Sequence, residues 1–291
     1  MTADNEKNKA RGYHGGGVDS VISVEEVNRQ AAAIAEDISI EQLDELAGNQ
    51  PHVSINNLVA GYGQMEILHN FNLRVGKAQS LCLIGPNGAG KSTILHAIFG
   101  FNRIFSGSIE IGSGSDRTDV TRMTPNQKLA KAGIAYILQD KSIFPGMTVE
   151  ENLWMGGFLK DKPQEAKLAA EKVFDKYSRL ADRRKHKAGV LSGGERRLLE
   201  ISRALVMNPE ILLVDEPSIG LEPRFIDMVF EILDDLQNKE GKTIIMVEQN
   251  AKKGLEFADI GYVLVSGELA IAGKGDDLLK NPKVGELFLG G

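Results

Sequence analysis

The sequence predicts an α/β fold built around a parallel β-sheet. Four continuous apolar runs are typical of strands buried on both faces of such a sheet: "SLCLIG", "IAYIL", "ILLVD" and "TIIMV". Amphipathic helical segments lie between them, such as residues 223–236, where Pro223 suits a first turn. Strands that alternate with helices in this way favour a parallel arrangement.

Further strands are predicted toward both ends of this core. Residues 52–63, 67–75 and 108–111 carry strand patterns, and we expect them to form a sheet near the start of the main domain. Near the C-terminus, "GYVLV" and "ELAIA" flank Ser266 and Gly267, which predicts a hairpin.

The first 50 residues differ from the rest in charge. They hold ten acidic and four basic side chains, so the whole net charge of -6 lies there. The first 20 residues are polar and contain three consecutive glycines, which indicates a flexible tail. We therefore divide the chain into an acidic N-terminal extension, residues 1–50, and a main domain, residues 51–291.

Two capping-box patterns lie inside the extension, Ser23 with Glu26 and Ser39 with Gln42. They predict that the extension is partly disordered or forms two short helices, which are marginal in water when isolated. Two interpretations stay open, a marginal appendage and a docking or autoregulatory arm.

Composition limits the classes of function. The chain has 291 residues, with 42% apolar and 25% charged side chains, as in ordinary globular proteins. It contains neither an apolar run of spanning length nor the apolar core of a signal peptide, so we expect it in the cytoplasm. The single cysteine, Cys82, lies in an apolar run and is predicted to be a core residue. Since residues 51–291 carry no net charge, electrostatics give no reason to expect nucleic-acid binding.

A phosphate-binding loop follows the first apolar run. "GPNGAGKST", residues 85–93, matches G-x-x-x-x-G-K-[ST] between a strand and a helix, where backbone N–H groups surround phosphate oxygens. Lys91 is expected to reach the β- and γ-phosphates and Ser92 to bind Mg²⁺. Alone, the motif predicts a nucleoside triphosphate and leaves GTPase, kinase, helicase and transporter open. The predicted nucleotide-binding residues are Gly85, Asn87, Gly88, Ala89, Gly90, Lys91, Ser92 and Thr93.

Two carboxylates end the run "ILLVDEP". The strand delivers Asp215 to the edge of the sheet where ligands bind, so this side chain is predicted to hold Mg²⁺. Glu216 follows and is predicted to act as the base that polarises the attacking water.

A second anion site is predicted at "LSGGERR". Ser192, Gly193 and Gly194 present a hydroxyl and bare backbone N–H groups at the start of a helix. One chain has no use for two phosphate cradles on one nucleotide, whereas a dimer does. Each chain's Ser-Gly-Gly is then expected to cap the γ-phosphate held by its partner.

With these motifs, residues 53–291 resemble the ATP-binding cassette (ABC) ATPase family. The resemblance implies a P-loop NTPase fold with a RecA-like parallel-sheet core, an antiparallel β subdomain and an α-helical subdomain at about residues 140–200. It implies ATP and Mg²⁺ as cofactors. It also implies that Tyr62 stacks on adenine and that Gln139 contacts Mg²⁺ and the attacking water.

The run "TIIMVEQN" departs from the family pattern. Gln249 occupies the switch position, which is usually histidine, and its amide can hydrogen-bond phosphate and water but cannot carry a proton. We therefore expect hydrolysis to depend more heavily on Glu216. The alternative is that Gln249 caps the next helix, although Asn250 is the better cap. Glu222 likewise replaces the family's usual aspartate.

The C-terminal segments "VEQN", "ADIGYVL" and "LGG" resemble an ATPase subunit of importers for branched-chain or hydrophobic amino acids. This resemblance implies a peripheral protein at the cytoplasmic face of the membrane. Its expected partners are a second ABC ATPase subunit, or a second copy, in a head-to-tail dimer, two transmembrane permeases and an external solute-binding protein. ATPases of urea importers and of lipopolysaccharide exporters are the alternatives.

Other classes fit less well. Soluble ABC proteins of translation usually carry two cassettes, and those of DNA repair carry a long coiled coil, whereas only 51 residues separate Gln139 from Leu191. A regulator with little catalysis is weakened by Glu216. The sequence lacks the N-K-x-D motif of GTPases, and its five histidines lack metal-ligand spacing.

Overall fold

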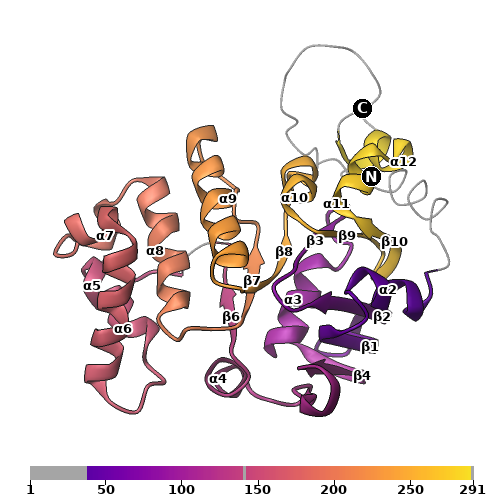
Figure 1. Cartoon of the computed structure of the whole chain (residues 1–291), viewed down its shortest axis with the longest axis horizontal. Helices are drawn as coiled ribbons and strands as arrows, with labels where there is room; N and C mark the ends of the chain where they lie inside the picture. The colour runs from indigo at the N-terminus through magenta and orange to yellow at the C-terminus, as the bar shows by residue number, and fades with distance from the viewer. Residues whose placement is uncertain (1–37, 140–141, 290–291) are drawn as a thin grey trace, which may run out of the picture.

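The computed structural model describes residues 38–139 and 142–289, and it confirms the predicted α/β fold (Figure 1). The described residues form a six-stranded sheet in the order β10-β9-β3-β8-β7-β6 and a four-stranded sheet in the order β2-β1-β4-β5. The larger sheet comprises β3 (Ser80–Ile84), β6 (Ile134–Ile137), β7 (Ile211–Asp215), β8 (Thr243–Val247), β9 (Ile260–Val265) and β10 (Glu268–Lys274). The smaller sheet comprises β1 (Pro51–Tyr62), β2 (Met65–Gly76), β4 (Arg103–Ile111) and β5 (Thr118–Asp119).

The six-stranded sheet is parallel from β9 to β6, and only its edge hairpin β9–β10 is antiparallel. Every residue of β3, β7 and β8 is buried, as the continuous apolar runs predict. Because these three strands are neighbours and parallel, their carboxyl ends meet at one edge. That edge brings together the phosphate loop, the Asp215–Glu216 pair and residues 248–250.

Helices cover both faces of this sheet (Figure 1). On one face, α3 packs against the sheet and the antiparallel strands through Ile94, Leu95 and Ile98, all fully buried. On the other, α9 and α10 bury Val229 and Leu255. The helices of this part are α3 (Lys91–Phe99), α4 (Pro125–Ala130), α9 (Pro223–Asn238), α10 (Ala251–Phe257), α11 (Gly275–Lys280) and α12 (Pro282–Val284).

A helical subdomain lies at one end of the molecule (Figure 1). It has its own apolar core, in which Leu153, Leu180 and Leu199 are fully buried. Trp154 packs against this core. The helices are α5 (Val149–Gly156), α6 (Pro163–Lys176), α7 (Ser178–Asp182) and α8 (Gly193–Leu205).

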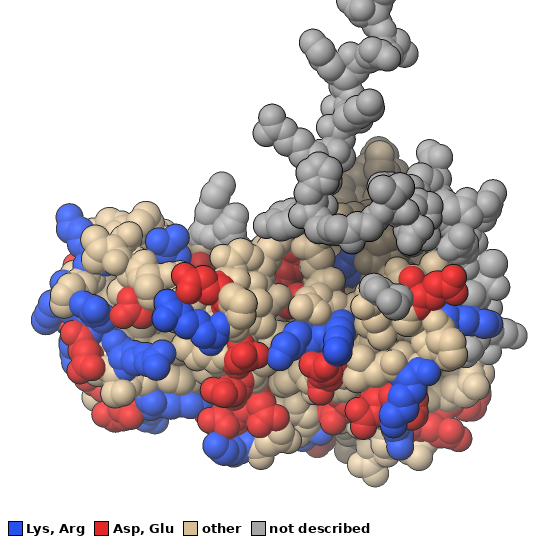
Figure 2. Space-filling model, turned by 90° about the horizontal axis from the view of Figure 1, so that it is seen from above, with Lys and Arg blue, Asp and Glu red and all other residues tan. Residues whose placement is uncertain are grey.

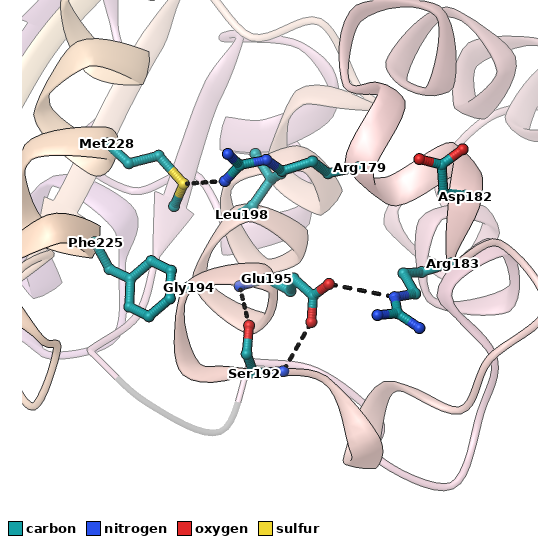
Figure 3. A pocket seen from close by; sticks show the side chains of 9 residues that line it. All are labelled: Arg179, Asp182, Arg183, Ser192, Gly194, Glu195, Leu198, Phe225 and Met228. Atoms are coloured by element: carbon teal, nitrogen blue, oxygen red, sulfur yellow. Dashed lines mark hydrogen bonds and ion pairs between the residues drawn. The ribbon is translucent and has the colours of Figure 1, made fainter.

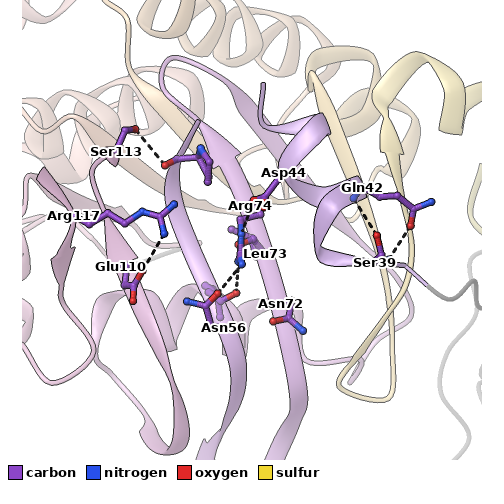
Figure 4. A network of polar contacts seen from close by, with 12 residues as sticks. Ser39, Gln42, Asp44, Asn56, Asn72, Leu73, Arg74, Glu110, Ser113 and Arg117 are labelled. Carbon is purple, nitrogen blue, oxygen red and sulfur yellow. Dashed lines mark hydrogen bonds and ion pairs between the residues drawn. The ribbon is translucent and has the colours of Figure 1, made fainter. Parts of the chain in front are cut away.

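The second predicted N-terminal helix is confirmed as α2 (Ile40–Leu46), with the Ser39–Gln42 capping box formed. The first capping box lies outside the described residues. α2 packs on β2 and buries Leu43 in the main core, so it is not the separate, marginal helix of the appendage interpretation. Arg74 on β2 donates a hydrogen bond to Asp44 on α2 over 3.0 Å (Figure 4).

Within the described ranges, no helix is long and apolar enough to span a membrane.

Candidate functional site

The predicted phosphate-binding loop lies between β3 and α3. Gly85 has φ of +147°, and a Cβ there would lie 2.3 Å from the Leu264 carbonyl oxygen, so only glycine fits. Lys91 opens α3 and is buried, with Nζ donating to the carbonyls of Gly85 at 2.8 Å and Pro86 at 2.9 Å. The loop therefore holds its lysine at its own centre, where a phosphate group is expected.

Asp215 joins the loop to the sheet edge. Its carboxylate is buried and accepts hydrogen bonds from Ser92 Oγ at 3.1 Å and from the Tyr136 hydroxyl at 2.8 Å. Two of the three predicted Mg²⁺ ligands, Ser92 and Asp215, thus lie in direct contact. Hydroxyl and carboxylate oxygens are the hard ligands that Mg²⁺ prefers, so this pair fits the ion. Tyr136 was not predicted to contribute.

Glu216 is held by the backbone as well as by a side chain. Its φ of +44° is unusual for a residue with a Cβ, and its N–H donates to the Val247 carbonyl over 2.9 Å. Gln139 Nε2 donates to its carboxylate over 2.9 Å, which brings the predicted base and glutamine together. A strained backbone maintained at such a position is a common property of active sites.

Burial and charge shift the pKa values of this cluster. Burial and the neighbouring Asp215 raise the pKa of Glu216 above its usual value, and Lys91 partly opposes them. Burial lowers the pKa of Lys91, and Glu216 and Asp215 oppose that shift. The shifts bring both groups toward neutral pH, as is often found for residues that transfer protons or stabilise charge.

The three polar residues that follow β8 differ in burial: Glu248 is buried, whereas Gln249 and Asn250 are exposed. Glu248, to which the sequence analysis assigned no role, is buried and accepts from Ser218 Oγ at 2.7 Å and from Asn250 N at 3.0 Å. Gln249 is exposed, and among the described residues its side chain forms no hydrogen bond with Asp215 or Glu216. Asn250 accepts from Lys253 N and caps α10, as predicted.

Tyr62 lies at the end of β1 with 44% of its surface exposed, which leaves its ring accessible. Its hydroxyl is 2.5 Å from Nδ1 of His96 on α3, and the two rings meet edge to face. This contact places the tyrosine beside α3, the helix that follows the predicted phosphate loop.

Ser192, Gly193 and Gly194 form the start of α8, as predicted, with Ser192 as the N-cap. A Cβ on Gly194 would lie 2.2 Å from the Phe225 ring, so this glycine also makes room for the first turn of α9. Within one chain, α8 lies on the far side of β7 from α3 and the phosphate loop (Figure 1).

Two hollows lie beside these residues. One, of about 540 Å³, is lined by Gln139, Gly193 and the loop residues Ile219 and Gly220, among others. The other, of about 430 Å³, lies between α7, α8 and α9 (Figure 3). On the face seen from above, Lys and Arg side chains are interspersed with Asp and Glu (Figure 2).

Comparison with known proteins identifies relatives of the chain. The family model described as ABC transporter matches residues 68–219. BraG of Pseudomonas aeruginosa, a high-affinity branched-chain amino acid transport ATP-binding protein, is 40% identical over 82% of this chain and 100% of its own length. The probable branched-chain amino acid transport ATP-binding protein LivF of Archaeoglobus fulgidus is 37% identical over 80% of this chain and 96% of its own. The crystal structure of the ADP conformation of MJ1267, an ATP-binding cassette of an ABC transporter, superposes with a TM-score of 0.71 and 28% identity, over 83% of this chain and 99% of that one.

Proposed function

The chain belongs to the ABC transporter family as an ATP-binding, ATP-hydrolysing subunit, and from this premise we propose that it powers uptake of branched-chain or other neutral amino acids. One observation carries the catalytic part of the proposal. At one edge of the sheet, Ser92 donates a hydrogen bond to Asp215, which joins two predicted metal ligands. At the same edge, Gln139 donates a hydrogen bond to Glu216, the predicted base.

In this proposal the nucleotide binds along α3. The loop from Gly85 to Thr93 surrounds the phosphates, Lys91 exchanges its bonds to loop carbonyls for phosphate oxygens, and Tyr62 stacks on the adenine. Ser92, Asp215 and Gln139 would hold Mg²⁺, and Gln139 also donates a hydrogen bond to Glu216. The bound ion neutralises charge on the phosphate oxygens.

Glu216 is the proposed base. A carboxylate with a raised pKa accepts a proton from water more readily, and the hydrogen bond from Gln139 keeps it oriented. Gln249 lies at the end of the neighbouring strand and is proposed to hydrogen-bond the γ-phosphate without moving a proton.

A second ATPase chain, either a sister subunit or another copy, is the proposed partner. Because α8 and the phosphate loop are separated within one chain, Ser192, Gly193 and Gly194 are free to cap a γ-phosphate held by the partner. A hollow beside the start of α8 is lined by Gln139, Gly193 and Ile219, and Ile219 is 42% exposed.

The proposed contact with the permeases is a groove of about 400 Å³ between the helical subdomain and the sheet. Phe101, Phe144 and Phe158 line it and are each more than 40% exposed, so the groove offers apolar contact area. The residues that line this groove include the one that directly precedes Gln139 in the sequence. Movement of a permease in the groove could therefore be transmitted through Gln139 to the proposed base. Two permeases, an external solute-binding protein and a place at the cytoplasmic face of the membrane complete the proposal.

Uptake of labelled leucine, proline, glycine and urea tests this function in cells whose only copy of the chain carries Glu216→Gln. We expect amino acid uptake to be lost and urea uptake to persist. Glu210→Gln is the matched control, because Glu210 is exposed at the opposite end of the same strand, β7. Loss of urea uptake alone would support a urea importer instead, and loss of neither would point to an exporter or a role outside transport.

A further inference from the structure

Glu195 places a negative charge in the turn of α8 that is proposed to receive phosphate. Its carboxylate accepts from Ser192 N over 2.9 Å, and its own N–H donates to Ser192 Oγ over 3.3 Å. This reciprocal capping box fixes the serine. It also places a like charge next to an incoming γ-phosphate, which opposes binding.

Arg183 lies at the opposite side of this charge. It follows α7, and its Nε donates to the second carboxylate oxygen of Glu195 over 3.3 Å (Figure 3). Hydrogen bonding by the Ser192 backbone is the first cause that lowers the pKa of Glu195, and Arg183 adds to it. The carboxylate is therefore ionised at neutral pH and paired.

The other charged groups of the 430 Å³ hollow are arranged differently. Arg179 also lines it, but its guanidinium donates to Met228 Sδ over 3.5 Å and points away from Glu195 (Figure 3). Asp182 carries a further negative charge on the same rim. Among the described residues, Arg183 is the cation that forms an ion pair with Glu195.

We propose that Arg183 is a positioning residue for ATP, because it neutralises Glu195 and holds it on the Ser192 backbone so that Ser192, Gly193 and Gly194 can receive a phosphate held by the partner chain. This inference rests on the proposed function. Without Arg183, the unpaired carboxylate repels the phosphate and is free to leave Ser192. ATP binding across the dimer is then weakened, while Glu216 and Gln139 are untouched.

The test is hydrolysis as a function of MgATP concentration, using the full-length chain purified in complex with its permeases. Arg183→Ala is expected to raise KM by about 3- to 5-fold and to change kcat by less than about 2-fold, in line with the modest energy of an exposed ion pair. The increase should shrink at high salt, because salt screens the repulsion. Arg183→Lys keeps the charge and should retain most of the affinity.

Adding Glu195→Gln to Arg183→Ala should restore the affinity for ATP. Glutamine can still accept from Ser192 N and complete the capping box, but it carries no charge. The double variant Arg183→Ala with Glu195→Gln should therefore return KM to within about 2-fold of the parent. Arg179→Ala is the matched control, since it removes a cation from the same hollow, and it should leave KM unchanged.

An unchanged KM in Arg183→Ala, or a double variant as impaired as the single one, would overturn this inference. Glu216→Gln is assayed alongside to separate the two proposals. If Glu216→Gln still hydrolyses ATP, the proposed catalytic site is wrong. If Glu216→Gln is inactive and Arg183 proves dispensable, only the role of Arg183 is lost.

Discussion

The hydroxyl of Ser218 donates a hydrogen bond to the buried carboxylate of Glu248 over 2.7 Å. The Ser218 N–H also donates to this carboxylate, over 3.3 Å, and Asn250 N donates over 3.0 Å. One side chain therefore ties the end of β8 to the loop that follows Glu216. This loop carries Ile219 and Gly220 at the proposed contact with the second chain.

Glu248→Gln should loosen this connection. The carboxylate accepts all of these hydrogen bonds, whereas one end of the glutamine amide is an NH₂ group that cannot accept. At least one donor then loses its partner, so we expect the free energy of unfolding to fall by about 1–3 kcal/mol. ATP turnover should fall as well, because the loop after Glu216 is no longer held. Chemical denaturation and steady-state hydrolysis measure the two effects. Glu256→Gln, on the exposed face of α10, should change neither, and equal effects of both substitutions would refute the role of Glu248.

Tyr136→Phe should weaken Mg²⁺ binding. The substitution removes the hydroxyl that donates to Asp215 over 2.8 Å, while the ring stays packed against Phe99 and Phe101. A hydrogen bond to a charged group contributes about 1.5–3 kcal/mol, so we expect the Mg²⁺ concentration for half-maximal hydrolysis to rise about 10-fold or more. A Mg²⁺ titration at fixed ATP measures this. An unchanged midpoint would show that Asp215 is oriented without the tyrosine.

The pH range over which the protein hydrolyses ATP should have an acidic limit set by Glu216 and a basic limit set by Lys91. Burial and Asp215 raise the pKa of Glu216 above 4.5, so its base form is lost as the pH falls through a value above 4.5. Burial lowers the pKa of Lys91 below 10.5, so its positive charge is lost as the pH rises through a value below 10.5. A profile of kcat/KM against pH should show both limbs. An acid limb at or below 4.5 would contradict the raised pKa of Glu216.

Leu43→Ala should destabilise the main domain although it lies in the N-terminal extension. Leu43 is 1% exposed in the main core, and truncating such a residue costs about 2–5 kcal/mol. Thermal denaturation of the full-length chain measures the shift. Glu45→Ala, on the exposed side of the same helix, should lie within about 0.5 kcal/mol of the parent. Equal midpoints for Leu43→Ala and the parent would show that α2 contributes nothing to stability.

Features encoded in short stretches of sequence could be predicted. The buried strands β7 and β8 follow from continuous apolar runs, the caps at Ser39 and Asn250 from residue type, and the phosphate loop from a complete motif between a strand and a helix. Each depends on neighbours within a few positions. Local patterns of this kind are strong enough to determine local structure.

Contacts between distant segments could not be predicted. Ser218 and Glu248 are 30 positions apart, and Tyr62 and His96 are 34 apart, so no periodicity links them. The burial of Leu43 depends on where β2 lies in the folded protein. Such contacts follow from the packing of whole elements, which a single sequence does not reveal.

The only cysteine in the sequence, Cys82, is fully buried in β3, and burial raises the pKa of its thiol well above the usual value. Labelling reagents react with thiolates, whereas the Cys82 thiol stays protonated and is shielded from solvent. A fluorophore or spin label can therefore be attached to a single cysteine introduced at Ile219 without first removing the native one. A label at this position would report how closely two chains approach during turnover.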